Sequence, residues 1–92
     1  MAQLEVDIVD ADGKVWSGPA RQVSAPAAEG EIGILPGHTP VLALLRAGQV
    51  HVQEHAGGPV TLKWQVDGGF LSVDSDQVTI VVDDAQTVAE TR

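Results

Sequence analysis

The segment VTLKWQV, residues 60–66, decides the fold class of this 92-residue chain, because apolar and polar side chains alternate along its whole length. In an extended strand the four apolar side chains from Val60 to Val66 would all face one side. Such a period of two indicates one face in a core and the other in water. The segment therefore predicts a half-buried β-strand.

The same alternation recurs on both sides of that segment. Leu4–Ile8, Val50–Val52 and Val78–Val82 each repeat it. The turn-forming residues Asp10–Gly13 would join the first of these strands to Lys14–Trp16 as a hairpin. Many short strands separated by turn residues are typical of a β-sandwich or a flattened barrel. We therefore expect an all-β domain.

Two segments depart from simple alternation. Val41–Leu45 is apolar at every position, so it is either one turn of helix or a strand buried on both faces, and the flanking Pro40 and Gly48 favour the strand. Further on, Gly68 and Gly69 are expected to shape a bend or bulge. Phe70, which follows them, is expected to enter the core.

The stretch EGEIGILPGHTP, residues 29–40, predicts a shaped loop, because three glycines and two prolines interrupt its apolar residues. Its glycines could let backbone N–H groups approach a phosphate. However, their spacing fits neither the dinucleotide nor the Walker pattern, and two glutamates lie within the stretch. A loop that contacts another protein is the better interpretation.

The composition narrows the possible partners. Thirteen acidic and five basic side chains give a formal net charge of −8. This charge would repel nucleic acid and anionic lipid, whereas it suits basic protein loops. The chain has no cysteine, no signal-peptide pattern, and no apolar run of the roughly 18 to 20 residues that a membrane helix needs. We expect a single soluble domain without direct lipid insertion.

No group of residues in the sequence suggests catalysis, a cofactor or a metal site. His51 and His55 would lie about 13 Å apart on a strand, which is too far for one zinc ion. Asp10–Gly13 resembles the start of a calcium loop, but Lys14 occupies the next ligand position. We therefore expect no catalytic residues, no metal and no cofactor.

The end of the chain is short and polar. We place the domain at residues 1–84 and treat residues 85–92 as a tail. With Asp83 or Asp84 as an N-cap, this tail could begin a helix of only about 15 Å, or it could be frayed.

Three segments carry a resemblance to a known family. LEVDIVDADGKVWSG (4–18), GEIGILPGHTPVLALLRAG (30–48) and VDGGFLSV (66–73) closely resemble the epsilon subunit of bacterial and plastid F-type ATP synthases, the counterpart of the mitochondrial delta subunit. The resemblance spans about residues 2–84. It implies a flattened ten-stranded β-sandwich in the central rotor stalk, which is bound to the gamma subunit and rests on the polar loops of the c-ring.

The resemblance also implies contact residues for both partners. Those for the c-ring loops are Glu29, Gly30, Glu31, Gly33 and Ile34, with Glu31 as the main contact. Those for gamma are Asp10, His38, Thr39, Pro40, Val41 and Ala43. The subunit would couple rotation to ATP synthesis without an active site of its own, at the cytoplasmic face of a bacterial plasma membrane rather than at a plastid thylakoid.

One departure from the family pattern concerns the C-terminus. Family chains usually continue into a helical hairpin that reaches the catalytic head and inhibits ATP hydrolysis. The ten residues after Val82 are too few for two helices. We therefore expect this chain to lack the inhibitory arm, and to contact the beta subunits of the head only where such an arm is present.

A second hypothesis from a different class stays open. The domain could be a β-barrel that binds a small ligand, with the glycine-rich stretch 29–40 at its mouth.

Overall fold

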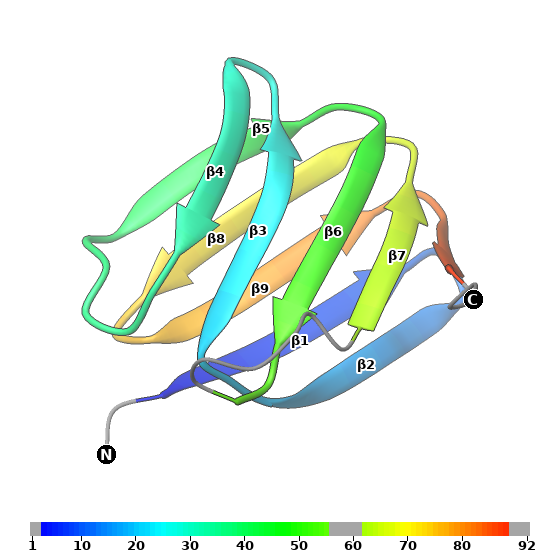
Figure 1. Cartoon of the computed structure of the whole chain (residues 1–92). Helices are drawn as coiled ribbons and strands as arrows, with labels where there is room; N and C mark the ends of the chain where they lie inside the picture. The colour runs from blue at the N-terminus through cyan, green and yellow to red at the C-terminus, as the bar shows by residue number, and fades with distance from the viewer. Residues whose placement is uncertain (1–2, 56–61, 89–92) are drawn as a thin grey trace.

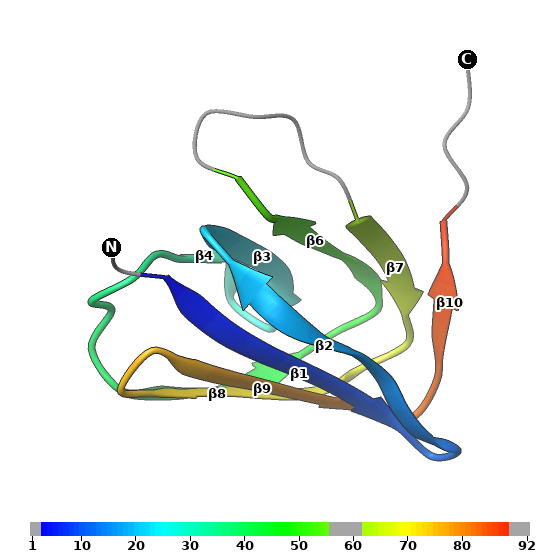
Figure 2. The same ribbon diagram turned by 90° about the horizontal axis from the view of Figure 1, so that it is seen from below.

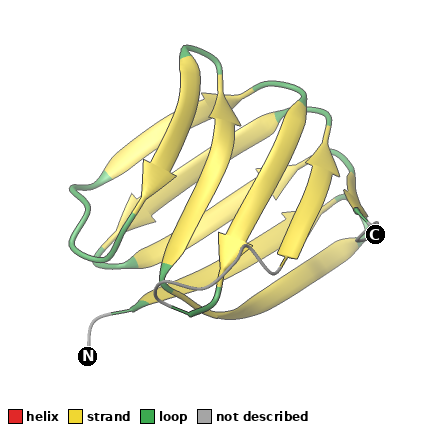
Figure 3. Cartoon of the chain, in the orientation of Figure 1, coloured by secondary structure: helices red, strands yellow, loops and turns green. Residues whose placement is uncertain are grey.

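The computed structural model describes residues 3–55 and 62–88, and every regular element in these ranges is a β-strand (Figure 3). The strands are β1 (Leu4–Asp10), β2 (Gly13–Ala20), β3 (Gln22–Ala27), β4 (Gly30–Ile34), β5 (Val41–Leu45), β6 (Gly48–Gln53), β7 (Leu62–Val66), β8 (Gly69–Asp74), β9 (Gln77–Val82) and β10 (Ala85–Thr87). The expected ten-stranded all-β fold is confirmed. The first two residues of the predicted strand 60–66 lie outside the described residues.

The strands form one sheet that is folded into two layers (Figures 1 and 2). Their order is β10-β7-β6-β3-β5-β8-β9-β1-β2, and β4 pairs with β3. The sheet folds between β3 and β5, which share one register pair, Ala27 with Leu45. We call β4, β3, β6, β7 and β10 the front layer, and β5, β8, β9, β1 and β2 the back layer. Every pairing is antiparallel except that of β1 with β9.

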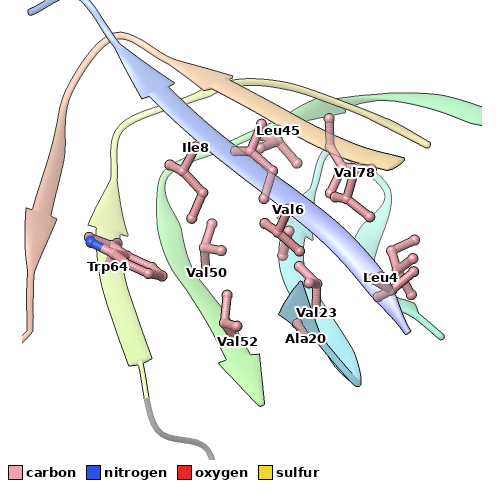
Figure 4. Close-up of a cluster of buried hydrophobic side chains, with 14 of the residues drawn as sticks. Leu4, Val6, Ile8, Ala20, Val23, Leu45, Val50, Val52, Trp64 and Val78 are labelled. Carbon is pink, nitrogen blue, oxygen red and sulfur yellow. The ribbon is translucent and has the colours of Figure 1, made fainter. Parts of the chain in front are cut away.

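The core lies between the two layers and consists mainly of aliphatic side chains (Figure 4). In β1, Leu4, Val6 and Ile8 are buried while the residues between them are at least partly accessible, and β9 repeats this pattern. Val50 and Val52 of the front layer supply the opposing surface. Burial of each such side chain contributes roughly 1.5–3 kcal/mol. The alternation of apolar and polar residues therefore identifies the segment as a strand and shows which of its side chains face the core.

Aromatic packing joins the layers on the side of the sandwich where β2 and β7 lie. The rings of Trp16 in β2 and Trp64 in β7 have centroids 5.8 Å apart and are tilted by 45°. Such a tilted pair contributes about 0.5–1.5 kcal/mol beyond the burial of its area. β10 pairs with β7 on the same side. On this side the layers are thus joined by side-chain packing, while β2 and β10 are the two ends of the strand order.

The structure corrects the predicted burial of two segments. Val41–Leu45 forms β5, but Leu42 and Leu44 are 72% and 69% exposed, so only one face of this strand is buried. Phe70 is 41% exposed and does not enter the core, because the adjacent Leu71 takes the inward position. A strand in a two-layer sandwich has a single inner face. An all-apolar strand therefore leaves every second side chain outside.

The predicted helix or frayed tail is wrong for the residues that directly follow Asp84. Ala85–Thr87 form β10, antiparallel to β7, with Ala85 opposite Val66. The Asp84 backbone N–H donates to the Asp67 carboxylate at 3.1 Å, which directs the chain back along β7. The edge of β7 supplies ready backbone partners, whereas a single helical turn would leave most of its groups unpaired. The end of the tail, residues 89–92, lies outside the described residues.

The predicted glycine bend is confirmed. Gly68 and Gly69 have φ angles of +132° and +143°. A Cβ on Gly69 would overlap the carbonyl oxygen of Val81 and lie 2.8 Å from the Cα of Val82. Only glycine allows β8 to begin so close to β9.

We predict that Gly69→Ala lowers the free energy of unfolding by about 2–4 kcal/mol, since the substitution adds both strain and overlap. Gly33→Ala is the matched control, because the nearest atom to a Cβ there, Nε2 of Gln22, is 4.0 Å away. The control should change stability by less than about 0.5 kcal/mol. Urea unfolding followed by tryptophan fluorescence measures both, and equal effects of the two substitutions would contradict the bend.

A polar network crosses the outer face of β2, β1 and β9. Asp7 pairs with the Lys14 ammonium at 3.1 Å and accepts a hydrogen bond from the Gln77 side-chain amide at 3.0 Å. Hydrogen bonding by Ser17, followed by that of Lys14, lowers the pKa of Asp7 below its usual value. The ionised carboxylate therefore stabilises the folded state.

A lowered pKa in the folded state gives a defined pH dependence. The stabilisation by Asp7 should be complete above the unfolded-state pKa near 4 and should disappear as the pH falls through the lower folded-state pKa. We predict that Asp7→Asn is less stable than the native chain at pH 7 and that this difference shrinks as the pH falls below about 4. Lys14→Met should show part of the same loss. Urea unfolding from pH 7 downward checks it, and a stability difference that stays constant as the pH falls would refute the role of the charge.

Candidate protein-interaction surface

The stretch 29–40, predicted as one shaped loop, is a strand between two turns. Gly30–Ile34 forms β4 and pairs with β3 along its whole length. A two-residue turn at residues 28–29 precedes it, and the segment 35–40 follows it. The two ends of β4 are about 13 Å apart, because a strand rises about 3.3 Å per residue. The residues assigned to the c-ring and to gamma are thereby separated.

The residues assigned to the c-ring do not share one surface. Glu29, Gly30 and Glu31 lie at the β3–β4 turn, and both glutamates are exposed. Ile34 lies at the other end of β4 and is fully buried in the core. Gly33 is exposed but also lies toward that end. Of the residues assigned to the c-ring, Glu29, Gly30 and Glu31 are therefore the ones that lie together at one end of β4.

The segment that carries His38 begins with a tight turn. The His38 backbone N–H donates to the Leu35 carbonyl at 3.1 Å, and Gly37 has a φ of +87°. Proline followed by a glycine with positive φ is typical of a type II turn. Nδ1 of His38 lies 2.7 Å from the Thr39 carbonyl oxygen, so Nδ1 is the protonated nitrogen in this contact. The ring is therefore held against its own segment, with Nε2 as the nitrogen left to accept a hydrogen bond.

Asp76 ties this turn to the back layer. Its carboxylate accepts a hydrogen bond from the Gly37 backbone N–H at 2.7 Å, and its carbonyl accepts one from the Glu5 backbone at 2.8 Å. Asp76 and Ser75 form the β8–β9 turn with φ angles of +65° and +52°. Such angles cost roughly 1–2 kcal/mol for a non-glycine residue. The contacts of Asp76 offset this strain and fix the His38 segment in place.

The residues assigned to gamma lie along the back layer but not at one point. Asp10 ends β1, at the opposite end of that strand from Glu5 and the His38 segment, and its carboxylate accepts a hydrogen bond from the Asp12 backbone. Val41 and Ala43 are on the inner side of β5 and are only partly accessible. The accessible side chains of β5 are Leu42 and Leu44.

A row of apolar side chains crosses the outer face of the back layer, where Leu42, Leu44 and Phe70 are exposed and Val9 and Val81 are partly accessible. In the strand registers Leu44 lies opposite Phe70, Phe70 opposite Val81, and Val81 opposite Val9. Leu42 extends this row along β5. We call these five residues the apolar row. At about 4.8 Å between strands, it spans about 14 Å from β5 to β1. Single exposed hydrophobic residues are ordinary, but a contiguous group marks an interaction site.

The outer face of the front layer is polar by contrast. Outward positions on β3, β6 and β7 carry Gln22, Ser24, Gln49, His51, Gln53, Lys63 and Gln65. His51 lies in this polar face, where its Nε2 is 3.0 Å from the Gln49 side-chain oxygen, and His55 is exposed. The two outer faces of the sandwich therefore have different chemistry. Three members of the apolar row, Leu42, Leu44 and Phe70, are at positions that the sequence predicted to be buried.

A groove lies between the β3–β4 turn and β5. Its volume is about 480 Å³, and it is lined by residues 27–32 and 41–44. Ile32 and Val41 lie at its base, partly buried and packed against the core. Glu29 and Glu31 are exposed at its border. The groove adjoins both the acidic turn and the β5 end of the apolar row.

Within residues 3–55 and 62–88, no three histidine or acidic side chains form a group that could hold a metal ion. The described part of the chain also has no helix long and apolar enough to cross a membrane.

Comparison with known proteins agrees with the fold. Residues 3–88 match the family described as the ATP synthase, Delta/Epsilon chain, beta-sandwich domain. An ATP synthase epsilon chain of Micrococcus luteus is 52% identical over 86 residues, which cover 94% of this chain and 92% of that protein. An epsilon chain of Bordetella petrii is 40% identical over 98% of this chain, but the match covers only 62% of that protein.

Solved structures give the same result. A chain in the mitochondrial ATP synthase of Euglena gracilis has a TM-score of 0.85 at 25% identity, over 95% of this chain and 54% of that one. A chain in the central stalk and c-ring structure of the Tetrahymena thermophila mitochondrial enzyme has a TM-score of 0.73 at 17% identity, over 89% and 64% of the two chains, and shows the shared fold. The chain belongs to the delta/epsilon family of ATP synthase subunits and carries the β-sandwich domain of that family.

Proposed function

We propose that this chain is a non-catalytic rotor subunit in the central stalk of a proton-translocating F-type ATP synthase. It links gamma to the c-ring and couples rotation of the ring to ATP synthesis. Membership of the epsilon-chain family supports this role, as does the fold shared with a chain of a central-stalk structure. In the assembled enzyme the domain lies at the cytoplasmic face of a bacterial plasma membrane, where protein contacts hold it.

The exposed apolar row is the observation that carries the gamma contact. Leu42 and Leu44 are exposed on the same face as Phe70, and nothing in the described residues covers them. The His38 segment lies at one end of this face and Asp10 at the other. Gamma therefore lies along the outer face of the back layer. Its contact includes His38, Thr39, Pro40 and Asp10 at the ends and the apolar row between them.

The acidic β3–β4 turn carries the c-ring contact. The two-residue turn at residues 28–29 projects beyond the neighbouring strands (Figure 1), and it carries the exposed Glu29, while the exposed Glu31 follows at the start of β4. Basic polar loops of a c-ring complement these carboxylates. A solvent-exposed ion pair contributes only about 0–1 kcal/mol, so the turn orients the domain on the ring rather than anchoring it.

The alternative of a small-ligand barrel has weaker support. The groove beside the β3–β4 turn is the place where such a ligand would bind, since it is lined by part of the glycine-rich stretch. However, its borders are exposed carboxylates and strand edges, without the convergent polar groups that fix a small ligand. A protein partner suits these borders better.

We predict that the double substitution Leu44→Ser and Phe70→Ser weakens binding to purified gamma by roughly 700-fold, because each of the two lost apolar contacts costs about 2 kcal/mol in a buried interface. Both side chains are exposed in the isolated domain, so its melting temperature should stay nearly unchanged. Gln22→Ser, on the polar face, is the control and should leave binding as it was. Titration calorimetry measures the affinities, and native-strength binding by the double variant would place gamma elsewhere.

We also predict that Glu31→Lys lowers the number of protons pumped per ATP hydrolysed in inverted membrane vesicles. The loss should be partial, because an exposed pair is worth at most about 1 kcal/mol. Glu31→Gln should have a smaller effect, since it removes the attraction without adding repulsion. Unchanged pumping in the lysine variant would remove Glu31 from the c-ring contact.

A further inference from the structure

The two sides of the sandwich are joined differently. Trp16 and Trp64 pack between the layers where β2 and β7 lie. On the opposite side, β3 meets β5 through the Ala27–Leu45 pair and the hydrogen bonds from Ala28 to Leu44 and from Arg46 to Pro26. At the other end of β4 the segment 35–40 connects it to β5, and Gly37 in this segment donates to Asp76. Between these two connections β4 and β5 separate, and the 480 Å³ groove lies between them.

The strand edge of β4 faces this groove. Within the described residues β4 pairs with β3 alone, so its second edge has no strand partner. Ala27 and Gly30 close the two-residue hairpin, which makes Pro26 and Glu31 the next opposed pair. In an antiparallel ladder the backbone groups of this second pair point away from each other. The Pro26 carbonyl points away from Glu31, because it accepts a hydrogen bond from the Arg46 N–H at 2.8 Å. The N–H and C=O of Glu31 therefore point outward, along the open edge.

The base of the groove is apolar and its border is acidic. Ile32 of β4 and Val41 of β5 point inward and are only partly buried, so a further apolar side chain can pack on them. Glu29 and Glu31 are exposed at the border. A strand laid along β4 would thus place alternate side chains on the apolar base and beside the carboxylates.

We infer that the open edge of β4 binds an extended segment of gamma that alternates apolar and polar side chains, and that this segment adds a strand to the front layer. The inference rests on the proposed function and specifies how gamma is held. One observation favours gamma as the source, because the groove continues directly into Leu42 and Leu44 of the apolar row. An exposed strand edge binds extended segments through backbone hydrogen bonds. A second copy of this chain fits poorly, because pairing two β4 edges would bring the glutamates of both copies together.

The test compares Glu31→Pro with Glu31→Gln in binding to purified gamma. Both variants lack the carboxylate, but only proline also lacks the N–H that points along the open edge. Proline is tolerated on edge strands at such positions. Glu31→Gln should weaken binding by no more than about fivefold. Glu31→Pro should weaken it a further three- to tenfold, approximately the share of one backbone hydrogen bond. Circular dichroism of both variants verifies that they are folded.

Amide hydrogen exchange of the native chain gives a second measure that needs no substitution. On addition of gamma, the Glu31 amide should exchange at least about tenfold more slowly, since an added strand would protect it. The folded Glu31→Pro and Glu31→Gln variants could bind gamma with equal affinity, and the Glu31 amide of the native chain could remain unprotected. This result would refute the added strand but not the binding of gamma itself. Protection by purified c-ring but not by gamma would overturn the choice of partner. A native chain that does not bind gamma at all would instead refute the proposed function.

Discussion

The burial of aliphatic side chains between two sheet layers is the constraint on which the rest of this domain depends. With 92 residues and a single core, each strand must contribute its inner side chains to one shared interior. No polar or charged side chain of the described residues is buried with them. The layers are consequently held by packing alone across most of their area. The polar networks, such as that of Asp7 with Lys14 and Gln77, are confined to the outer surface.

This constraint explains how much of the fold could be read from the sequence. A period of two identifies a strand and also its inner face, so β1, β6, β7 and β9 follow from alternation alone. The Asp10–Gly13 hairpin and the Gly68–Gly69 bend follow from turn chemistry. Alternation fails where every residue is apolar. In Val41–Leu45, and at Phe70 beside Leu71, composition cannot tell which side chains face out. That choice is made by register with neighbouring strands.

The same limit applies to the interaction surface. The contact roles of the β3–β4 glutamates and of the His38 segment were implied by the family resemblance, and the turns that hold these residues were indicated by glycine and proline. The apolar row was not identifiable, because its members come from four strands that are brought side by side only by pairing. The hydrogen bond between Asp76 and Gly37 joins residues 39 positions apart and leaves no local pattern. Surfaces made by tertiary pairing are therefore the part that sequence patterns miss.

The parallel pairing of β1 with β9 has a consequence for the synthesis of the chain. β1 leaves the ribosome before the other strands of this domain, yet one of its two neighbours, which pairs Val6 with Val78 and Ile8 with Ile80, is β9. Contacts between such distant segments make folding slow, because a long loop must close before they form. The inner face of β1 cannot be fully covered until β9 has emerged. During translation the domain is therefore an incomplete sandwich with exposed aliphatic side chains, and its native state arises late and cooperatively, when β9 pairs with β1.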